Sequence, residues 1–202
     1  MYAFYTGGIA LSDAGKIILA SNSPRRRELL AQMGVSFCVE TPDVDEEDAA
    51  TPEGTVRALS DQKARAVAER HFTEDALILA ADTVVFCEGI LGKPKDSQDA
   101  ARMLRLLSGR WHDVYTGVCL MRTPDMRAKA RVERTRVHFT HLTDAQIARY
   151  VQTGEPMDKA GAYALQGQAG MFIDRIEGSA SNVIGLPMAA VRDLLCAYGI
   201  ML

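Results

Sequence analysis

The sequence predicts an α/β fold, because strand-like and helix-like segments alternate along its 202 residues. Hydrophobic residues make up 48% of the chain and charged residues 24%, both ordinary for a globular protein. A chain of this length buries roughly 70% of its unfolded surface, so it needs neither disulfides nor a structural metal. No apolar run reaches the ~18 residues of a membrane helix, which argues against a membrane partner.

The first half of the chain begins with a buried strand and a helix. Ser23 is the expected N-cap of that helix, with Pro24 at its first position and Gly34 as its stop. A second helix begins after Thr51, and Lys63 shares the helical spacing of its apolar residues. In order, the expected elements are a strand over 16–20, the first helix, a strand over 37–40, an acidic loop over 41–51 and the second helix.

The strongest strand signal covers residues 76–86, which are apolar on both faces except at Asp82 and Thr83. The elements expected after it are a helix over 98–108 capped by Ser97, an antiparallel pair over 114–122 and 131–140, a helix from Thr143 to about 152, a strand over 171–176 and a last helix from Pro187.

Charge and cysteine usage indicate the environment. The net charge of −3 gives no basis for binding nucleic acid. The four cysteines, Cys38, Cys87, Cys119 and Cys196, stand apart in apolar stretches, which predicts buried free thiols in a reducing, cytoplasmic compartment. Residues 1–15 lack the pattern of a signal peptide and are interpreted as a short extension before a single domain over 16–202.

Three arginines follow Ser23-Pro24 in the first turn of a predicted helix. The helix dipole is already positive there, which disfavours a cation by about 0.3–1 kcal/mol. The placement suits an arriving anion, because free backbone N–H groups, the hydroxyls of Ser21 and Ser23 and the guanidinium groups of Arg25 and Arg26 together form a polyphosphate cradle. The alternative is a solvated basic turn with an ordinary serine cap.

Acidic side chains stand at two places. Burying Asp82 in a two-sided apolar strand is costly unless the carboxylate is paired or binds a metal. The alternatives are a structural hydrogen bond or a strand end that faces water. Glu46 belongs to a dense acidic group, which is either a metal ligand set or a solvated loop.

Two further segments look suited to a ligand. Lys93 is fixed between a turn glycine and a proline. Residues 154–167 form a polar loop rich in glycine, in which Gln166 stands just before Gly167; the alternative is a plain connection. His112, at a helix-to-strand corner, is expected to be structural.

The order of these motifs is more specific than any one of them. SxSPRRxELL, an acidic loop, a KA-bearing helix, AADT, GKP, SGRxHxVxTGV, GEPxDKAGAYxxQG and GSxxNVxGLP follow one another from Ile17 to Leu195. This series resembles the Maf-like nucleotide pyrophosphatases. The resemblance implies an elongated mixed sheet with flanking helices and two lobes around a nucleotide cleft, as in inosine triphosphatases. It also implies hydrolysis of a nucleoside triphosphate between its α- and β-phosphates with a divalent cation.

The resemblance also implies roles for single residues. Asp82 matches the proton acceptor, and Arg25, Thr83 and Gln166 match positions that separate the dTTP/UTP branch from the branch acting on 7-methyl-GTP. The expected substrate contacts are Ser21, Ser23, Arg25, Arg26, Lys63, Thr83, Lys93 and Gln166. The expected ligands of Mg²⁺ or Mn²⁺ are Glu46 and Asp82.

Several alternatives stay open at this point. One is the 7-methyl-GTP branch, and another is a septum-formation inhibitor that acts by binding rather than turnover. The sequence also leaves open whether the pyrimidine nucleotide is standard or modified, and whether the chain forms a homodimer. The family usually has an aromatic residue after Gly178-Ser179, where this chain has Ala180, so the resemblance does not predict how that segment packs.

Overall fold

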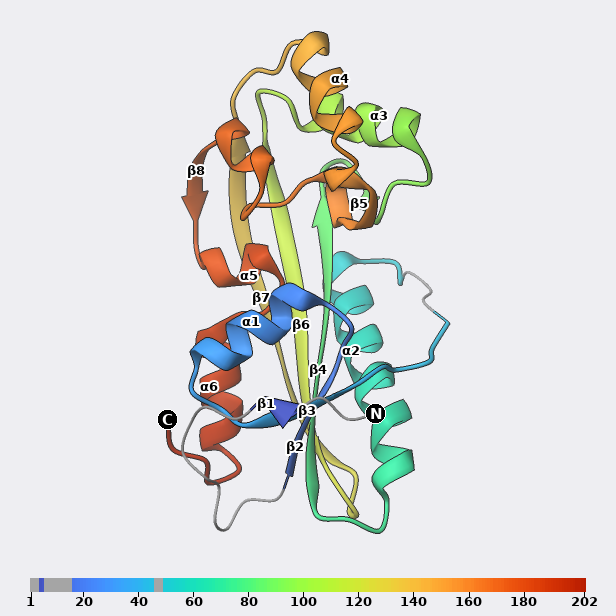
Figure 1. Cartoon of the computed structure of the whole chain (residues 1–202), viewed down its shortest axis with the longest axis vertical. Helices are drawn as coiled ribbons and strands as arrows, with labels where there is room; N and C mark the ends of the chain where they lie inside the picture. Colours follow the sequence, from blue (N-terminus) through green and yellow to red (C-terminus); the bar gives the residue numbers. More distant parts are fainter. Residues whose placement is uncertain (1–3, 6–15, 46–48) are drawn as a thin grey trace. The chain divides into compact units, whose positions relative to one another are not determined.

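A mixed eight-stranded sheet forms the frame of the computed structural model, which describes residues 4–5, 16–45 and 49–202. The strands are β1 (Phe4–Tyr5), β2 (Lys16–Ala20), β3 (Phe37–Glu40), β4 (Ala76–Phe86), β5 (Ile90–Leu91), β6 (Trp111–Arg122), β7 (Arg127–Phe139) and β8 (Ile173–Glu177). Their order is β1-β3-β2-β4-β6-β7-β8, and β5 pairs with β4 (Figure 1). β2 runs parallel to β3 and to β4, whereas the pairs β1–β3, β4–β5 and β7–β8 are antiparallel.

Helices alternate with these strands, so the predicted α/β class with a mixed sheet is confirmed. They are α1 (Pro24–Gln32), α2 (Pro52–Ala68), α3 (Ser97–Leu107), α4 (Asp144–Gln152), α5 (Ala180–Ile184) and α6 (Met188–Cys196). Four 3₁₀ helices are η1 (Glu69–His71), η2 (Glu155–Asp158), η3 (Ala160–Ala162) and η4 (Gln168–Phe172). β1 lies inside the predicted extension and pairs with β3; residues 1–3 and 6–15 lie outside the described part, and the single domain over 16–202 stays a prediction.

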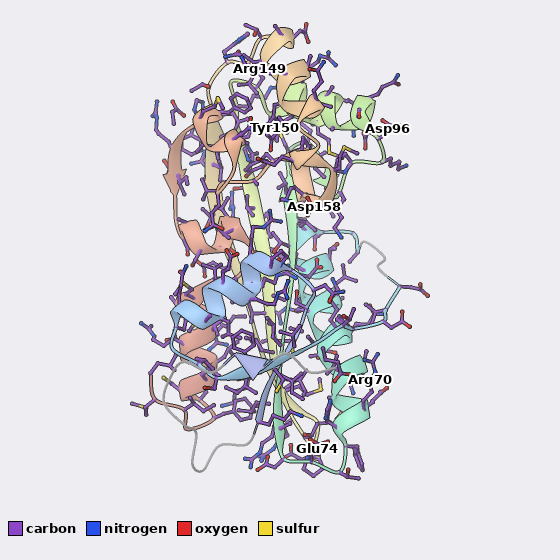
Figure 2. All side chains as sticks on the ribbon, in the orientation of Figure 1. Arg70, Glu74, Asp96, Arg149, Tyr150 and Asp158 are labelled. Carbon is purple, nitrogen blue, oxygen red and sulfur yellow. The ribbon has the colours of Figure 1, made fainter. Side chains whose placement is uncertain are left out.

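The predicted helix caps are confirmed at Ser23, Thr51 and Thr143. The prediction that Ser97 caps α3 was wrong, because the N-cap is Asp96, which is labelled at the start of this helix in Figure 2. The Asp96 side chain accepts a hydrogen bond from the backbone N–H of Asp99, with Oδ1 and N 2.8 Å apart. A carboxylate at this position also meets the positive end of the helix dipole. The last strand begins at 173 rather than 171, because η4 takes up the residues before it.

The chain divides into two compact units. Unit 1 holds residues 1–82, 116–133 and 185–202, and unit 2 holds residues 83–115 and 134–184. The residues of β4, β6 and β7 are therefore shared between the units.

One core cluster of unit 1 contains many small side chains. The cluster contains Ile18, Ala20, Ala64, Val67, Ala68, Ala76, Ile78, Ala80, Cys119 and Met121. Gly117 of β6 permits the closest approach, because a Cβ at this position would lie 2.1 Å from the carbonyl oxygen of Val56 in α2. No other residue fits there without moving the helix. The glycine therefore fixes the position of α2, and Lys63 lies on the buried face of that helix.

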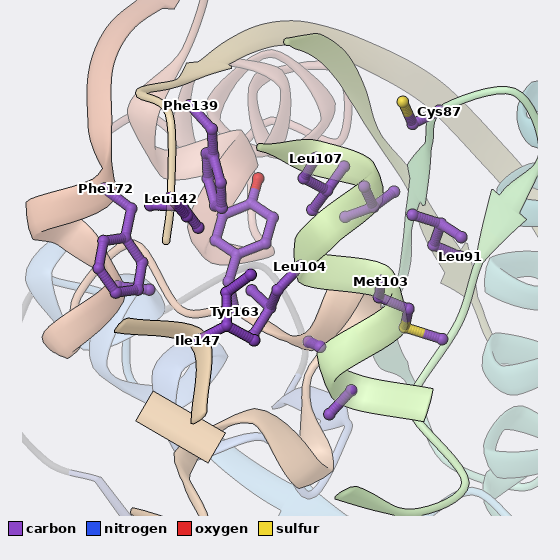
Figure 3. Packing of buried hydrophobic residues seen from close by; sticks show 14 of the residues in the cluster. Cys87, Leu91, Met103, Leu104, Leu107, Phe139, Leu142, Ile147, Tyr163 and Phe172 are labelled. Carbon is purple, nitrogen blue, oxygen red and sulfur yellow. The ribbon is translucent and has the colours of Figure 1, made fainter. Parts of the chain in front are cut away.

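Unit 2 has a separate core in which aromatic rings meet edge to face. Figure 3 shows Tyr163 beside Phe139 among aliphatic side chains of α3. The ring centroids of Phe139 and Tyr163 are 4.9 Å apart at 72°, and those of Tyr150 and Phe172 are 5.5 Å apart at 87°. Such tilted pairs bring the positive ring edge against the negative ring face.

Three of the four cysteines are buried free thiols, as predicted, but Cys196 is exposed. The prediction failed there because α6 buries Ala190, Val191, Leu194 and Leu195, and Cys196 falls outside this helical stripe. Within the part of the chain that the structure describes, no helix is long and apolar enough to cross a membrane.

His112 of β6 is buried in the aromatic core of unit 2, in agreement with a structural role. Its Nε2 lies 2.9 Å from the hydroxyl oxygen of Tyr163. Its Nδ1 is buried and has no hydrogen-bond partner among the described residues. Burial lowers the pKa of His112 from its ordinary value of 6.5 to about 4; Asp113 acts to raise this pKa and His138 to lower it. The folded protein therefore holds a neutral imidazole.

We expect this imidazole to make folding sensitive to acid. Above pH 6.5 His112 is neutral in both the folded and the unfolded chain, so it adds no pH dependence. As the pH falls from 6.5 to about 4, only the unfolded chain takes up the proton. The depressed pKa then costs stability on the order of 3 kcal/mol by pH 4. Urea denaturation of wild type and His112→Gln between pH 7 and pH 4 measures this loss.

The variant should lose less stability on acidification than wild type does. His141→Gln is the matched control, because His141 is exposed and its replacement should leave the wild-type pH dependence in place. Equal acid sensitivity in wild type and His112→Gln would contradict the prediction.

Candidate functional site

The turn between β2 and α1, in unit 1, is held by the two predicted serines. The Ser21 hydroxyl oxygen accepts hydrogen bonds from the backbone N–H of Ser23 at 3.2 Å and from Nη1 of Arg26 at 3.3 Å. The Ser23 hydroxyl oxygen accepts from the backbone N–H of Arg26 at 3.4 Å. Ser21 is buried and Ser23 half-buried. Both serines therefore shape the turn. Pro24 has no backbone N–H, and the N–H groups of Arg26 and Arg27 donate to Ser23, so the N–H of Arg25 is the one left in the described first turn for an anion.

The three arginines of α1 have different surroundings. Arg26 donates from Nε to the carbonyl oxygen of Gly185 at 2.8 Å, which ties the start of α1 to the segment before α6. Nε of Arg27 is buried and has no hydrogen-bond partner among the described residues. Arg25 is half-buried, and its side chain forms no hydrogen bond or ion pair within the described ranges. With no acidic residue in the first turn of α1, Arg25 is the guanidinium group best placed to meet a phosphate.

Asp82 and Lys63 form a buried ion pair inside unit 1. Nζ of Lys63 lies 2.6 Å from Oδ1 of Asp82, and the two side chains are only 9% and 10% exposed. The costly carboxylate predicted in β4 is therefore paired, as its burial requires. The parallel register that pairs Leu19 with Leu79 brings Ser21 and Asp82 close to the same level on neighbouring strands. The paired carboxylate thus lies on the strand beside the one that leads into the α1 turn.

The described residues include no group of three or more His, Cys, Asp or Glu side chains that would enclose a metal ion. Glu46, the second predicted ligand, lies outside the described residues. Oδ1 of Asp82 faces Lys63, while Oδ2 has no partner in the described part of the chain. Mg²⁺ is commonly bound through one or two carboxylates together with substrate phosphates and water. The open oxygen of Asp82 fits such a cation.

Unit 2 brings together the segments that carry the other three predicted residues. The backbone N–H of Gly161 donates to the carbonyl oxygen of Gly92, next to Lys93, at 3.0 Å. Gly161 has a φ of +67°, and a Cβ there would lie 2.8 Å from the side chain of Val85. Thr83 is two residues from Val85 on the same strand and therefore on the same face.

Within this arrangement, Lys93 and Gln166 are the exposed side chains. Neither forms a side-chain hydrogen bond or ion pair with another described residue. Gly161 to Ala164 are buried, so the chain emerges from the core just before Gln166. An amide and an ammonium group are thus presented on neighbouring segments of unit 2.

Sequence reasoning missed Glu155 as a separate contributor. Its Oε1 accepts a hydrogen bond from the Tyr150 hydroxyl at 2.8 Å, and its Oε2 accepts one from the backbone N–H of Gln168 at 3.1 Å. A Cβ at Gly167 would lie 2.1 Å from this carboxylate. The sequence signal that could have revealed this contact is the glutamate at the start of the loop together with the glycine at its end.

The segment that departs from the usual pattern, Gly178 to Asn182, packs by polar contacts instead of an aromatic ring. Asn182 is buried, and its Nδ2 donates to the carbonyl oxygen of Val114 at 3.1 Å and to the hydroxyl of Thr135 at 3.0 Å. Thr135 also accepts from the backbone N–H of Ser179 at 3.1 Å. The segment is therefore held within unit 2 without the aromatic residue.

Comparison with known proteins gives a consistent result. A family model described as Maf-like protein matches residues 16–198. The dTTP/UTP pyrophosphatase of Pelotomaculum thermopropionicum is 50% identical over 187 residues, covering 91% of this chain and 97% of the relative. Proteins of the same name from Moorella thermoacetica and Anaeromyxobacter dehalogenans are 50% and 47% identical, each over 92% of this chain and over 96% and 95% of their own lengths. The chain, with the motif series that runs from the α1 turn to the segment before α6, belongs to the Maf-like protein family.

Proposed function

We propose that this protein hydrolyses dTTP and UTP to the nucleoside monophosphate and pyrophosphate. The observation that carries the proposal is the buried ion pair between Lys63 of α2 and Asp82 of β4, in which Nζ and Oδ1 are 2.6 Å apart. β4 runs beside β2, the strand that leads into the α1 turn. The relatives named dTTP/UTP pyrophosphatase, which are up to 50% identical to this chain, support the same activity.

Cleavage of a phosphoanhydride needs charge stabilisation and positioning more than covalent chemistry. In the proposed mechanism, Lys93 and Arg25, through its side chain and its backbone N–H, neutralise the phosphates. Lys63 fixes the Asp82 carboxylate through Oδ1 and adds positive charge near the triphosphate. The Asp82 carboxylate takes the proton from the attacking water.

A divalent cation, Mg²⁺ or Mn²⁺, would be held by Asp82 together with Glu46. When bound, such a cation neutralises charge on the phosphate oxygens. The contribution of the chain is the open Oδ2 of Asp82, whose orientation Lys63 fixes.

Thr83 and Gln166 are the proposed contacts to the base. Both side chains offer donors and acceptors, which suits the mixed edge of uracil or thymine.

The proposed location is the cytoplasm, which suits the buried free thiols Cys38, Cys87 and Cys119.

The role of Asp82 is tested by Asp82→Asn. The amide keeps an acceptor for Lys63 but cannot take the proton and is a poor ligand for a cation, so kcat should fall at least ~10²-fold. Pyrophosphate release from UTP measures the loss. Asp75→Asn is the control: this exposed carboxylate of unit 1 also faces a cation, Arg122, and its replacement should leave turnover unchanged. Turnover by Asp82→Asn at the wild-type rate would remove Asp82 from the catalytic role.

The position of the cut is tested by the products. The sequence has no GxxxxGK[ST] loop for transfer of a γ-phosphate, and we expect cleavage between the α- and β-phosphates. Chromatography of UTP after complete reaction should show UMP and pyrophosphate in equal amounts. UDP and orthophosphate would instead identify a different reaction.

Base selection is tested by Gln166→Glu. Glutamate loses the two amide donors and adds a negative charge, so kcat/KM for UTP and dTTP should fall roughly 10–200-fold, while the preference moves toward guanine nucleotides. Steady-state kinetics with UTP, dTTP and GTP measure this change. Gln98→Glu makes the same exchange at an exposed position of α3 and should keep the wild-type preference. An unchanged UTP-to-GTP ratio in Gln166→Glu would place base selection elsewhere.

A further inference from the structure

The segment that carries Gln166 is anchored just behind it by Glu155. Gly167 lies directly against the Glu155 carboxylate, so that a side chain at this position would displace the carboxylate from its present place. The same carboxylate accepts hydrogen bonds from the backbone N–H of Gln168 and from the hydroxyl of Tyr150 in α4. The backbone on the C-terminal side of Gln166 is thus fixed to η2 and α4.

A second anchor lies three residues before Gln166, at Tyr163. The Tyr163 ring is buried against Phe139 (Figure 3), and its hydroxyl shares a hydrogen bond with Nε2 of His112. His112 in turn packs edge-on against Phe139, with ring centroids 5.1 Å apart. Both polar groups of the pair are held inside an apolar core, where a satisfied hydrogen bond is costly to break.

Between the anchors only Ala164, Leu165, Gln166 and Gly167 are left, and the Gly167 N–H donates to the carbonyl oxygen of Ala164 at 3.1 Å. This tight turn has little freedom of its own once both ends are fixed. The amide of Gln166 is therefore presented from a rigid support, although its own side chain is exposed.

We propose that Glu155 and the His112–Tyr163 pair are positioning residues that hold the Gln166 amide in the orientation that selects pyrimidine bases. The inference rests on the proposed function and adds the residues that determine its specificity. A specificity group works only when the residues behind it lock its geometry. Loosening either anchor lets the amide turn away from the base edge, while the phosphate-binding and catalytic groups of unit 1 keep their own contacts.

The experiment uses Glu155→Ala and Tyr163→Phe in the full-length protein. Each variant should lower the UTP-to-GTP ratio of kcat/KM by roughly 3–10-fold, the range that one hydrogen bond accounts for. The change should come from a higher KM for UTP with kcat nearly unchanged. Glu155→Gln, which keeps one acceptor oxygen, should restore part of the ratio.

The matched controls make the same chemical changes elsewhere. Glu177→Ala removes an exposed glutamate of unit 2 that pairs with Arg136. Tyr198→Phe removes a hydroxyl that donates to the carbonyl oxygen of Arg127 in unit 1. Both controls should keep the wild-type ratio.

A double-mutant cycle separates positioning from general packing. If Glu155 acts through Gln166, then Glu155→Ala should not lower the ratio further in a Gln166→Ala background. Hydrogen exchange of the Gln168 amide, which does not depend on turnover, should be faster in Glu155→Ala than in wild type.

Each other outcome overturns the inference. Equal losses of activity on UTP and GTP would show that the anchors serve only stability, and a further fall of the ratio in the Gln166→Ala background would show that they act independently of Gln166. If Gln166→Ala keeps the wild-type UTP-to-GTP ratio, Gln166 does not select the base, and the anchors have no residue on which to act. A wild-type protein that hydrolyses neither UTP nor dTTP would instead refute the proposed function, and this inference with it.

Discussion

The burial of one carboxylate determines much of how unit 1 is built. Asp82 lies in a strand that is otherwise apolar on both faces apart from Thr83, so an unpaired charge there is too costly. Lys63 of α2 is the partner, and its Nζ lies 2.6 Å from Oδ1 of Asp82. The helix comes close enough to the sheet only because Gly117 has no side chain against Val56. The small residues of the unit 1 core follow from the same close approach. The buried carboxylate, its lysine partner and the glycine that admits the helix thus belong to one set of linked contacts.

The basic turn of α1 illustrates how identical residues take different tasks. Arg26 is committed to the backbone of Gly185 and to Ser21, so it stabilises the turn that presents the helix N-terminus. Arg25 forms no such contact with another described residue, and it is the arginine that we propose meets the substrate phosphates. Arginine suits both tasks because its planar fork donates several hydrogen bonds in fixed directions.

In unit 2, by contrast, the buried side chains of His112 and Tyr163 are uncharged. Burial lowers the pKa of His112 to about 4 and raises the pKa of Tyr163 well above its ordinary value. The pair therefore hydrogen-bonds inside an aromatic core without introducing a charge. Together with the Glu155 carboxylate at the surface of the unit, it supports a short turn whose one exposed amide belongs to Gln166.

The sequence by itself determined the α/β class, the caps at Ser23, Thr51 and Thr143 and the family, because periodicity, capping residues and motif order are local properties of the chain. It also identified Asp82 as a carboxylate in need of a partner. Only the tertiary structure decided that this partner is Lys63, that Arg26 is occupied by a carbonyl oxygen, that Asp96 rather than Ser97 caps α3 and that Glu155 supports Gly167. Three of these contacts join residues that come together only in the folded chain, and at α3 two adjacent residues could each cap the helix. The spacing and the type of the residues do not determine which of the possible pairs forms.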